Sequence, residues 1–343
     1  MKITTVGFDL AKSVFQVHGV DERGHAVANR KLKRAQVAPF FANLPSCLVG
    51  MEACGSSHYW ARKLQELGHT VRLIAPQFVK PYVKANKTDA ADAAAICEAV
   101  GRPHMRFVPI KCVESQALLA LHRARQGFIR SRVAQTNQLR GFLAEFGIII
   151  SQGAWKIEPR VADILEDAEN GLPGTVRELL LQLVGHVRFL SEQEKLLEAQ
   201  IKRWHEGSET STRIAQIPGI GPLTASALVA SIGDVGVFRN GRQLAAWLGL
   251  VPRQHSSGGK AQLLGISKRG DTYLRTLLTH GARSVIACAA RKPGYAQSWL
   301  GRLIARRHTN IAVCALANRN ARVVWALLKH DRQYRADYAA QAA

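Results

Sequence analysis

Four acidic side chains in the first hundred residues have the types and the order needed to hold divalent cations. Asp9 and Glu52 each follow a short apolar segment that is typical of a buried strand. Asp89 and Asp92 are spaced i, i+3, which places both carboxylates on one face of a helix. Four carboxylates that face one another repel strongly unless cations lie between them. The pattern therefore predicts a divalent cation site.

The chemistry that such a site supports is phosphodiester cleavage. Carboxylate oxygens are the ligands that Mg²⁺ or Mn²⁺ prefers, and a pair of these ions stabilises both the attacking and the leaving oxygen. Each acid alone also has a structural explanation, since Asp9 could begin a turn and Asp89 could cap its helix. The order strand–Asp, strand–Glu and helical Asp pair instead favours an RNase H-like nuclease core. Its most distinctive segment is Lys87–Asp92.

A second candidate group lies in the segment Leu250–Lys260, whose composition predicts a loop. Ser256 and Ser257 stand beside glycines there, with the cations Arg253 and Lys260 close in sequence. A serine nucleophile with cationic neighbours could act on a phosphate, because the cations stabilise phosphoryl charge. A flexible, solvated loop explains the same composition. The residues alone do not decide between these interpretations.

The segment Ile217–Gly221, followed by a helix, resembles a helix-hairpin-helix element. Gly219 and Gly221 would let the backbone approach a phosphate, and the next helix offers unpaired N–H donors. The alternative is a tight turn that touches no ligand. The basic surroundings favour phosphate contact, to which Lys268 and Arg269 at the start of a later helix would add.

The net charge indicates a polyanionic partner. The chain has 47 Lys and Arg against 25 Asp and Glu, a net of +22. Counted by segment, residues 1–110 carry +7, residues 111–216 carry +1 and residues 217–343 carry +14. Binding to phosphates releases counterions, so such a surface favours nucleic acid. A membrane is disfavoured, because there is no apolar run of 18 residues and no basic amphipathic helix with apolar anchors.

The six cysteines form no CxxC pair and have no closely spaced histidine partner, so a zinc site is not expected. Buried, reduced thiols in a reducing compartment are the better interpretation. The segment Met1–Thr5 leads directly into a strand and lacks a signal-peptide layout. We therefore expect a cytoplasmic protein.

Alternating strand and helix patterns must position the acids. Three early strands are followed by helix, strand, helix, strand and helix, which predicts a mixed sheet with helices packed on it. The strands are expected at 3–8, 14–20, 26–28, 47–52 and 71–75, and the helices at 35–43, 58–67 and 88–100.

The middle of the chain predicts a helical hairpin followed by a helical, basic C-terminal region. Helices are expected at 114–146, 277–290 and 311–328. A heptad seam follows the middle breaks, and it either packs internally or pairs with a second chain. Its members are Leu180, Leu183, Val187, Leu190, Leu197, Ile201 and Trp204.

Five sequence blocks in this order resemble the DEDD insertion-sequence transposases of insertion-sequence family one-hundred-and-ten, which includes the Piv-type invertases and the RNA-bridged recombinases. From Asp9 to about Arg322, the resemblance covers nearly the whole chain. The blocks are Val6–Lys12, Met51–Gly55, Asn86–Asp92, Ile217–Gly221 and Gly249–Arg253.

The resemblance implies an α/β plus α architecture with three domains. They are a RuvC-like metal-binding nuclease domain (1–110), a coiled-coil connector (111–210) and a C-terminal transposase domain that binds nucleic acid (211–343). It also implies that the four acids are catalytic. The family's nucleophilic serine matches the pair Ser257-Gly258, with Ser256 as the alternative because the register could shift by one. Lys12 matches a lysine of relatives that would touch a phosphate, or is a surface lysine.

The resemblance further implies partners. Such enzymes recombine the element ends with target DNA, guided by a non-coding RNA from the element, in the bacterial cytoplasm at the nucleoid. A serine that acts with a metal site across a subunit interface requires a homodimer or homotetramer. This favours intermolecular pairing of the heptad seam.

Two other hypotheses remain open. A metal-only nuclease of the junction-resolvase kind would use water as the nucleophile and form no covalent intermediate. A non-enzymatic RNA-binding or architectural protein would explain the charge, but not four acids in nuclease order within a basic chain.

Overall fold

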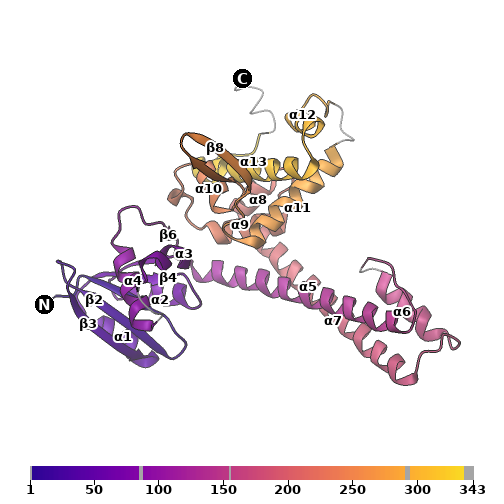
Figure 1. Ribbon diagram of the computed structural model, residues 1–343, viewed down its shortest axis with the longest axis horizontal. Coiled ribbons are helices and arrows are strands. Elements are labelled where there is room, and N and C mark those ends of the chain that lie inside the picture. The colour runs from indigo at the N-terminus through magenta and orange to yellow at the C-terminus, as the bar shows by residue number, and fades with distance from the viewer. Residues whose placement is uncertain (1, 85–87, 154–155, 290–293, 336–343) are drawn as a thin grey trace. The chain divides into compact units, whose positions relative to one another are not determined.

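The computed structural model describes residues 2–84, 88–153, 156–289 and 294–335. The chain forms two compact units, which Figure 1 shows coloured along the chain. Unit 1 comprises Met1–Val113 with Ile232–Asp234, and unit 2 comprises Glu114–Ser231 with Val235–Ala343. The first is a mixed α/β unit and the second is mainly helical. The predicted mixed N-terminal region and helical C-terminal part are therefore confirmed.

A six-stranded sheet forms the centre of unit 1, in the order β3-β2-β1-β4-β5-β6. The strands β1, β4 and β5 are parallel, whereas β2, β3 and β6 are each antiparallel to a neighbour. Five of these strands were predicted, and the short β6 was not. Their bounds are β1 Thr5–Asp9, β2 Val14–Val20, β3 Ala26–Lys33, β4 Leu48–Glu52, β5 Thr70–Ile74 and β6 Phe107–Val108.

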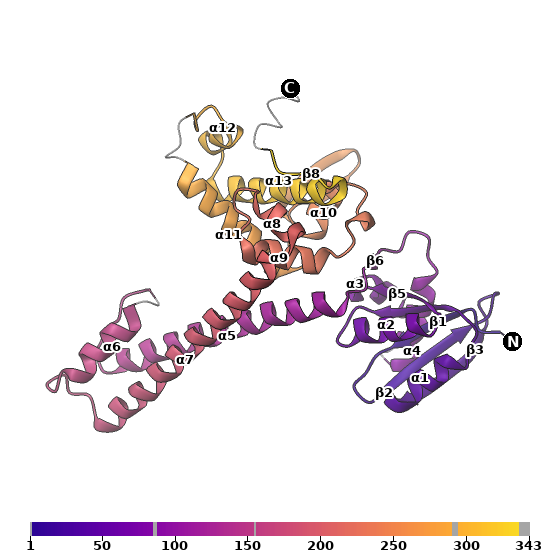
Figure 2. The same ribbon diagram turned by 180° about the vertical axis from the view of Figure 1, so that it is seen from behind.

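Helices cover both faces of the sheet. Along β1, successive side chains point to opposite faces and so contact different helices. Phe8 points to the face covered by α1 (Arg34–Ala42) and α2 (Ser57–Glu66), where its ring packs against Phe41 and Trp60. Its neighbour Gly7 points the other way, toward α4 (Asp89–Val100). Figure 2 shows these helices around the sheet. The short α3 (Pro76–Val79) and the 3-10 turn η1 (Lys80–Tyr82) precede α4.

The helix α4 lies very close to the sheet because two strands present a glycine beneath it. A Cβ atom on Gly7 would lie 2.5 Å from the backbone nitrogen of Cys97, and one on Gly50 would lie 2.7 Å from the Val100 Cβ. Gly7 and Gly50 are register partners in the β1–β4 ladder. A side chain at either position would push the helix away from the strands that end in Asp9 and Glu52.

Unit 2 begins with a long antiparallel pair of helices, α5 (Val113–Glu145) and α7 (Gly174–Glu206), which carry α6 (Ile157–Glu166) near the distal end in Figure 1. Ion pairs join the two helices. Arg125 binds Glu198, and Arg132 donates to Glu194 over 3.1 Å. Arginines of α5 are thus neutralised by acids of α7.

The heptad seam of α7 packs inside the chain. Leu180 lies in a buried cluster with Leu139 and Leu143 of α5, and Ile201 lies in another with Leu118. The internal packing that was one of the two alternatives for this seam is therefore observed for these residues.

The described part of unit 2 contains six further helices and a pair of strands. The long α13 packs against α10 and α11, and its buried residues include Ala317, Ala321 and Val324. The bounds are α8 Glu209–Ala215, α9 Pro222–Ile232, α10 Gly241–Trp247, α11 Thr272–Ala289, α12 Trp299–Arg306 and α13 Thr309–His330, with a 3-10 turn η3 at Val235–Val237.

By length and composition, α13 is apolar enough to cross a membrane. Its buried face and its two arginines, Arg319 and Arg322, are those of a core helix with a polar side. The apolar character of α13 is thus explained by packing within unit 2.

Candidate active site

Asp9 and Glu52 end two neighbouring parallel strands at the same edge of the sheet. The ladder between β1 and β4 pairs Phe8 with Met51, and each acid is the next residue in its strand. Both acids are half-buried. The sequence-based prediction that two apolar strands lead into adjacent acids is therefore confirmed for this pair.

The pKa of the Cys54 thiol, which lies close to this edge, is affected by both acids. This pKa is raised by partial desolvation and, after that, by the negative charges of Glu52 and Asp9. Charge interactions strong enough to move a pKa act over short distances. The two carboxylates therefore concentrate negative charge in one place.

The first turn of α4 holds the other two acids. Thr88 caps this helix by accepting a hydrogen bond from the Ala91 N–H over 3.2 Å, which leaves the carboxylates of Asp89 and Asp92 uncommitted to the cap. Asp92 is half-buried and Asp89 is exposed. Asn86 and Lys87 of the same sequence block lie outside the described residues.

The direction of α4 brings this turn toward the ends of β1 and β4. Near the start of β1, the Cys97 thiol donates to the Thr5 carbonyl over 3.8 Å, and further along, Gly7 faces Ala93. The helix α4 is thus antiparallel to β1, and its first turn lies toward the end of the strand that carries Asp9. All four predicted acids belong to one end of the sheet of unit 1.

The donor set fits a hard divalent cation, although the acids are not assembled into a complete cage. Carboxylate oxygens are the preferred ligands of Mg²⁺, and the shared negative charge around Cys54 is what a cation would offset. Among the described residues, no group of three or more His, Cys, Asp or Glu side chains is close enough to hold a metal. The neighbouring Lys12 is exposed on the loop after β1.

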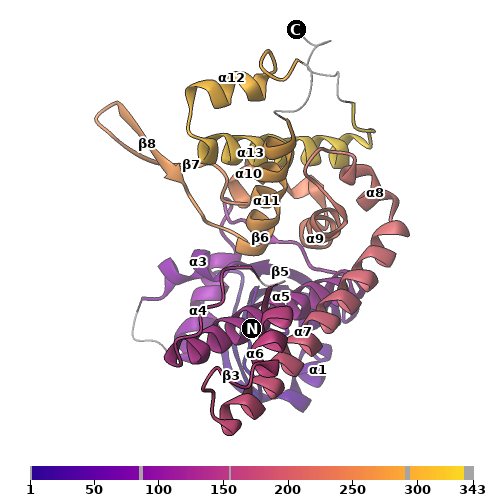
Figure 3. The same ribbon diagram turned by 90° about the vertical axis from the view of Figure 1, so that its right-hand side faces the viewer.

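The serine segment is a β-hairpin, which corrects the predicted loop. Its strands are β7 (Pro252–Ser257) and β8 (Lys260–Ile266), and Ser257 pairs with Lys260 across a two-residue turn. Gly258 and Gly259 in that turn have φ angles of 55° and 77°, the backbone that this type of hairpin turn requires. The strands were missed because both are exposed almost throughout and show no alternation of apolar and polar residues. Figure 3 shows the hairpin extending from the helices of unit 2.

Both candidate serines are exposed at the tip of this hairpin, but they differ in their contacts. The Ser256 hydroxyl accepts a hydrogen bond from the Gln254 Nε2 over 2.8 Å. In the described parts of the chain, the Ser257 hydroxyl has no hydrogen-bond partner, and the Lys260 ammonium belongs to its cross-strand neighbour. Ser257 is thus the freer hydroxyl.

Glycines fix the base of the hairpin to α10. A Cβ atom on Gly249 would lie 2.8 Å from the backbone nitrogen of Arg269, and Lys268 donates its N–H to the Gly249 carbonyl over 3.2 Å. Lys268 itself adopts a left-handed backbone, with φ 54°. The side chains of Lys268, Arg269 and, on β7, Arg253 are exposed.

The two glycines of the Ile217–Gly221 turn have different surroundings. Gly219, with φ 88°, packs against α11, where its Cβ would lie 2.8 Å from the Gly281 carbonyl oxygen. Gly221 is exposed, and an added Cβ there would meet nothing within 4 Å. Gly219 is therefore required for helix packing, an explanation that the sequence analysis did not consider.

Comparisons with known proteins agree with these elements. A family model described as a transposase, of the DEDD type of IS110 elements, matches residues 6–148, and the model "Transposase IS116/IS110/IS902 family" matches residues 211–297. A "Probable family 20 transposase" of Pseudomonas aeruginosa is 54% identical over 98% of this chain and 99% of its own length. The chain belongs to the IS110 family of insertion-sequence transposases.

Two further relatives of this transposase carry element names. The transposase for insertion sequence element IS1111A of Coxiella burnetii is 44% identical over 97% of this chain and 92% of its own length. The transposase for IS1328 of Yersinia enterocolitica is 43% identical over 94% of this chain and 96% of its own length. Membership in the family implies an enzyme that cuts and rejoins DNA.

A buried polar network in unit 2 of the transposase was missed by the sequence analysis. The His122 Nε2 lies 3.1 Å from the Ser226 hydroxyl, and its Nδ1 lies 2.9 Å from the Tyr273 hydroxyl. Since the Ser226 hydroxyl donates to the Pro222 carbonyl over 2.7 Å, it must accept from His122 Nε2–H. Burial, and then Arg125, lower the pKa of His122 to about 4, so the ring is neutral. Its position among apolar residues at helical spacing was the available signal.

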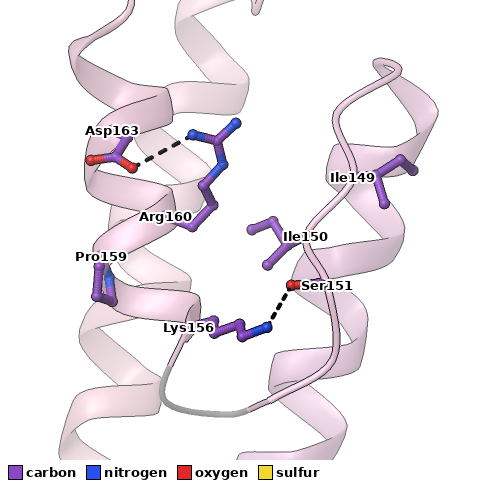
Figure 4. A pocket seen from close by; sticks show the side chains of 7 residues that line it. All are labelled: Ile149, Ile150, Ser151, Lys156, Pro159, Arg160 and Asp163. Atoms are coloured by element: carbon purple, nitrogen blue, oxygen red, sulfur yellow. Dashed lines mark hydrogen bonds and ion pairs between the residues drawn. The ribbon is translucent and has the colours of Figure 1, made fainter.

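A cavity of 390 Å³ lies between α6 and the segment that follows α5 (Figure 4). Its acid, Asp163, is paired with Arg160 over 3.5 Å, and Lys156 donates to Ser151 over 3.1 Å. An acid that is already neutralised has little charge left for a cation. This cavity is therefore not a second candidate for the metal site of the transposase.

Proposed function

We propose that this transposase binds Mg²⁺ or Mn²⁺ through Asp9, Glu52, Asp89 and Asp92, and that residues 1–110 form an RNase H-like, RuvC-like nuclease domain. The single observation that carries the proposal is the adjacency of Asp9 and Glu52 at the ends of paired parallel strands. The raised pKa of Cys54 supports it, because the negative charges of both Glu52 and Asp9 act on this thiol. When bound, the cations would polarise the scissile phosphate and stabilise the charge that develops in the reaction.

We propose Ser257 as the nucleophile. Its hydroxyl oxygen attacks the DNA phosphorus, a serine–phosphate bond forms, and one P–O bond of the strand breaks. The released strand end leaves as a hydroxyl by taking up a proton, which balances the proton that the serine hydroxyl loses. A hydroxyl of the second strand then attacks the phosphoserine, which restores the serine and a phosphodiester. The number of phosphodiester bonds is unchanged, so the reaction needs no external energy source.

Cations near Ser257 support this role. Lys260 is its cross-strand neighbour, and Arg253 is an exposed residue of the same strand. Positive charge near a phosphate under attack stabilises the transition state more than the ground state. The uncommitted Ser257 hydroxyl favours this residue over Ser256, whose oxygen is already hydrogen-bonded.

We further propose that residues 211–343 bind the DNA substrates and an element-encoded guide RNA. The net charge of +14 on residues 217–343 and the exposed cations Lys268 and Arg269 support a phosphate-binding surface. Gly221, exposed before α9, remains a candidate for close phosphate contact, as does Lys12 in unit 1. Residues 111–210 would act as the helical connector. Sequencing of RNA that copurifies with the protein, expressed with its flanking DNA, tests the RNA partner.

Ser257 and the four acids lie in different units, so we propose a site assembled from both, in a homodimer or homotetramer. The exposed position of the hairpin supports this assembly, since its tip is not occupied by neighbouring residues of unit 2. The working compartment would be the bacterial cytoplasm, at the nucleoid where the DNA lies.

Trapping on nicked element-end DNA tests the chemistry. The wild-type protein and Ser256→Ala are expected to form a covalent protein–DNA adduct in the presence of Mg²⁺. Ser257→Ala and Asp89→Asn are expected to form none while still binding DNA. Cleavage by Ser257→Ala without any adduct would instead indicate a metal-only nuclease, in which water attacks.

A further inference from the structure

The segment from α11 to α13 has a one-sided charge. Residues 272–330 contain ten Lys and Arg and no Asp or Glu. Within the described parts of this segment, residues 272–289 and 294–330, none of these cations forms an ion pair with a carboxylate. Elsewhere in unit 2 the pattern is different, since Arg125 and Arg132 on α5 are neutralised by acids of α7. Unpaired cations without acidic neighbours indicate a polyanionic partner.

The helix α12 gathers an aromatic ring and two of these cations on one face. Trp299, Arg302 and Arg306 are spaced i, i+3 and i+7, and all three are exposed. At the helical rise, the row spans about 10 Å. The intervening apolar residues Leu303 and Ile304 are half-buried, so the helix has a packed side and a solvent side.

A fourth residue joins the row from α13. The Arg319 guanidinium carbon lies 5.0 Å from the centre of the Trp299 ring. Trp299 nevertheless remains 37% exposed. A cation above one part of the ring leaves indole surface free for a second planar group, and keeps the charge ready for a phosphate.

The opposite side of α12 is fixed in place. A Cβ atom on Gly301 would lie 2.9 Å from the Ala296 Cα, so the preceding turn packs directly on the helix backbone. The Ser298 hydroxyl caps the helix by accepting from the Gly301 N–H over 3.0 Å. The row is therefore presented on a fixed support, which reduces the entropy lost when a ligand binds.

We propose that Trp299, Arg302, Arg306 and Arg319 form a binding site for single-stranded nucleic acid. A base stacks on the Trp299 indole, and the arginines bind the phosphates on either side. An aromatic ring within a row of cations is the arrangement that binds unpaired strands, because a base in a duplex is not free to stack on a side chain. The inference rests on the proposed function only in taking the partner to be nucleic acid.

Binding of labelled oligonucleotides to the full-length protein tests the site without requiring strand cleavage. Trp299→Ala is expected to weaken binding of oligo-dT or oligo-rU about tenfold, and Trp299→Phe to weaken it less. The double variant Arg302→Ala/Arg306→Ala should reduce the slope of log K against log salt by about 1.4, or 0.7 for each lost phosphate contact. Quenching of tryptophan fluorescence by the oligonucleotide should be smaller in Trp299→Phe. The oligonucleotide that binds more tightly, oligo-dT or oligo-rU, shows whether the site prefers DNA or RNA.

Two matched controls lie on the helical pair. Phe189→Ala removes another exposed aromatic ring and Arg130→Ala another exposed cation, and neither should change the affinity. Wild-type affinity in Trp299→Ala would overturn the proposal. The proposal would also be overturned if the variants lost as much affinity for a blunt duplex as for the single strands and the quenching were unchanged. That result would indicate a general phosphate-binding surface. Because Ser257→Ala should bind the oligonucleotides normally, failure of the catalytic proposal would remain distinguishable.

Discussion

Gly7 on β1 and Cys97 on α4 are in such close contact that a single methyl group would not fit between them. A Cβ atom on Gly7 would lie 2.5 Å from the Cys97 backbone nitrogen. This approach holds α4 against the strands that end in Asp9 and Glu52, and so determines how near the acids of its first turn can come. The fold of unit 1 and the proposed metal site thus depend on the same contact.

Gly7→Ala is expected to lower the free energy of unfolding by about 2 kcal/mol, because an overpacked helix–sheet contact must open. Urea unfolding of the full-length protein measures the change. Gly55→Ala is the matched control, since an added Cβ there meets nothing within 4 Å. Equal stability of the two variants would contradict the packing described for α4.

Asp9→Asn and Glu52→Gln should each weaken the affinity for a divalent cation at least tenfold. In other metal sites, even the loss of a group that only supports a ligand weakens the affinity by about this factor. Titration calorimetry with Mn²⁺ measures this affinity directly. Glu178→Gln on α7 removes an exposed carboxylate from unit 2 and should leave the affinity unchanged. A wild-type affinity in either strand-end variant would move the metal site away from this edge.

The buried His122 predicts a dependence of stability on pH. Burial, and then Arg125, lower its pKa from 6.5 to about 4 in the folded protein. Between these pH values the unfolded chain binds a proton on this ring and the folded chain does not. Its contribution to stability is therefore full above pH 6.5 and is lost as the pH falls to about 4, by on the order of 3 kcal/mol.

His122→Gln should flatten this part of the pH profile, whatever its effect on stability at neutral pH. Urea unfolding at a series of pH values checks the difference in slope between the two proteins. His186→Gln changes an exposed histidine on α7 and serves as the control. The same slope in wild-type and His122→Gln would mean that the ring does not remain neutral in the folded state.

The two glycines of the Ile217–Gly221 turn should respond differently to substitution. Gly219→Ala would combine a left-handed backbone with a clash against Gly281, and is expected to cost about 2 kcal/mol or more. Gly221→Ala should leave the thermal midpoint almost unchanged, because its surroundings are open. If both variants were equally stable, the packing role assigned to Gly219 would be wrong.

Much of unit 1 could be predicted because its patterns are local. The apolar segments before Asp9 and Glu52 indicate buried strands, and Thr88 marks the start of α4. The register that puts the two acids side by side is not local, and neither is the close approach of α4. Strand pairing depends on contacts between residues far apart in the chain, so the sequence suggested a common site without locating it.

Unit 2 departed from expectation where one pattern allowed two structures. The seam at Leu180 and Ile201 has the same spacing whether its partner is α5 or a second chain, and in this structure both residues lie in buried clusters with residues of α5. The segment around Ser257 looked like a loop because strand pairing across Gly258–Gly259 is invisible in composition. His122 was overlooked because a single histidine in an apolar pattern does not indicate which distant residues will bind it.

The most direct test of the account is to identify the amino acid that becomes linked to DNA. The trapped adduct would be digested with protease and nuclease, and the linked peptide sequenced by mass spectrometry. We predict a nucleotide phosphate on Ser257, formed only with Mg²⁺ or Mn²⁺ present and only when Asp9 is intact. A phosphate on another residue, or complete strand cleavage with no linked peptide, would contradict the account.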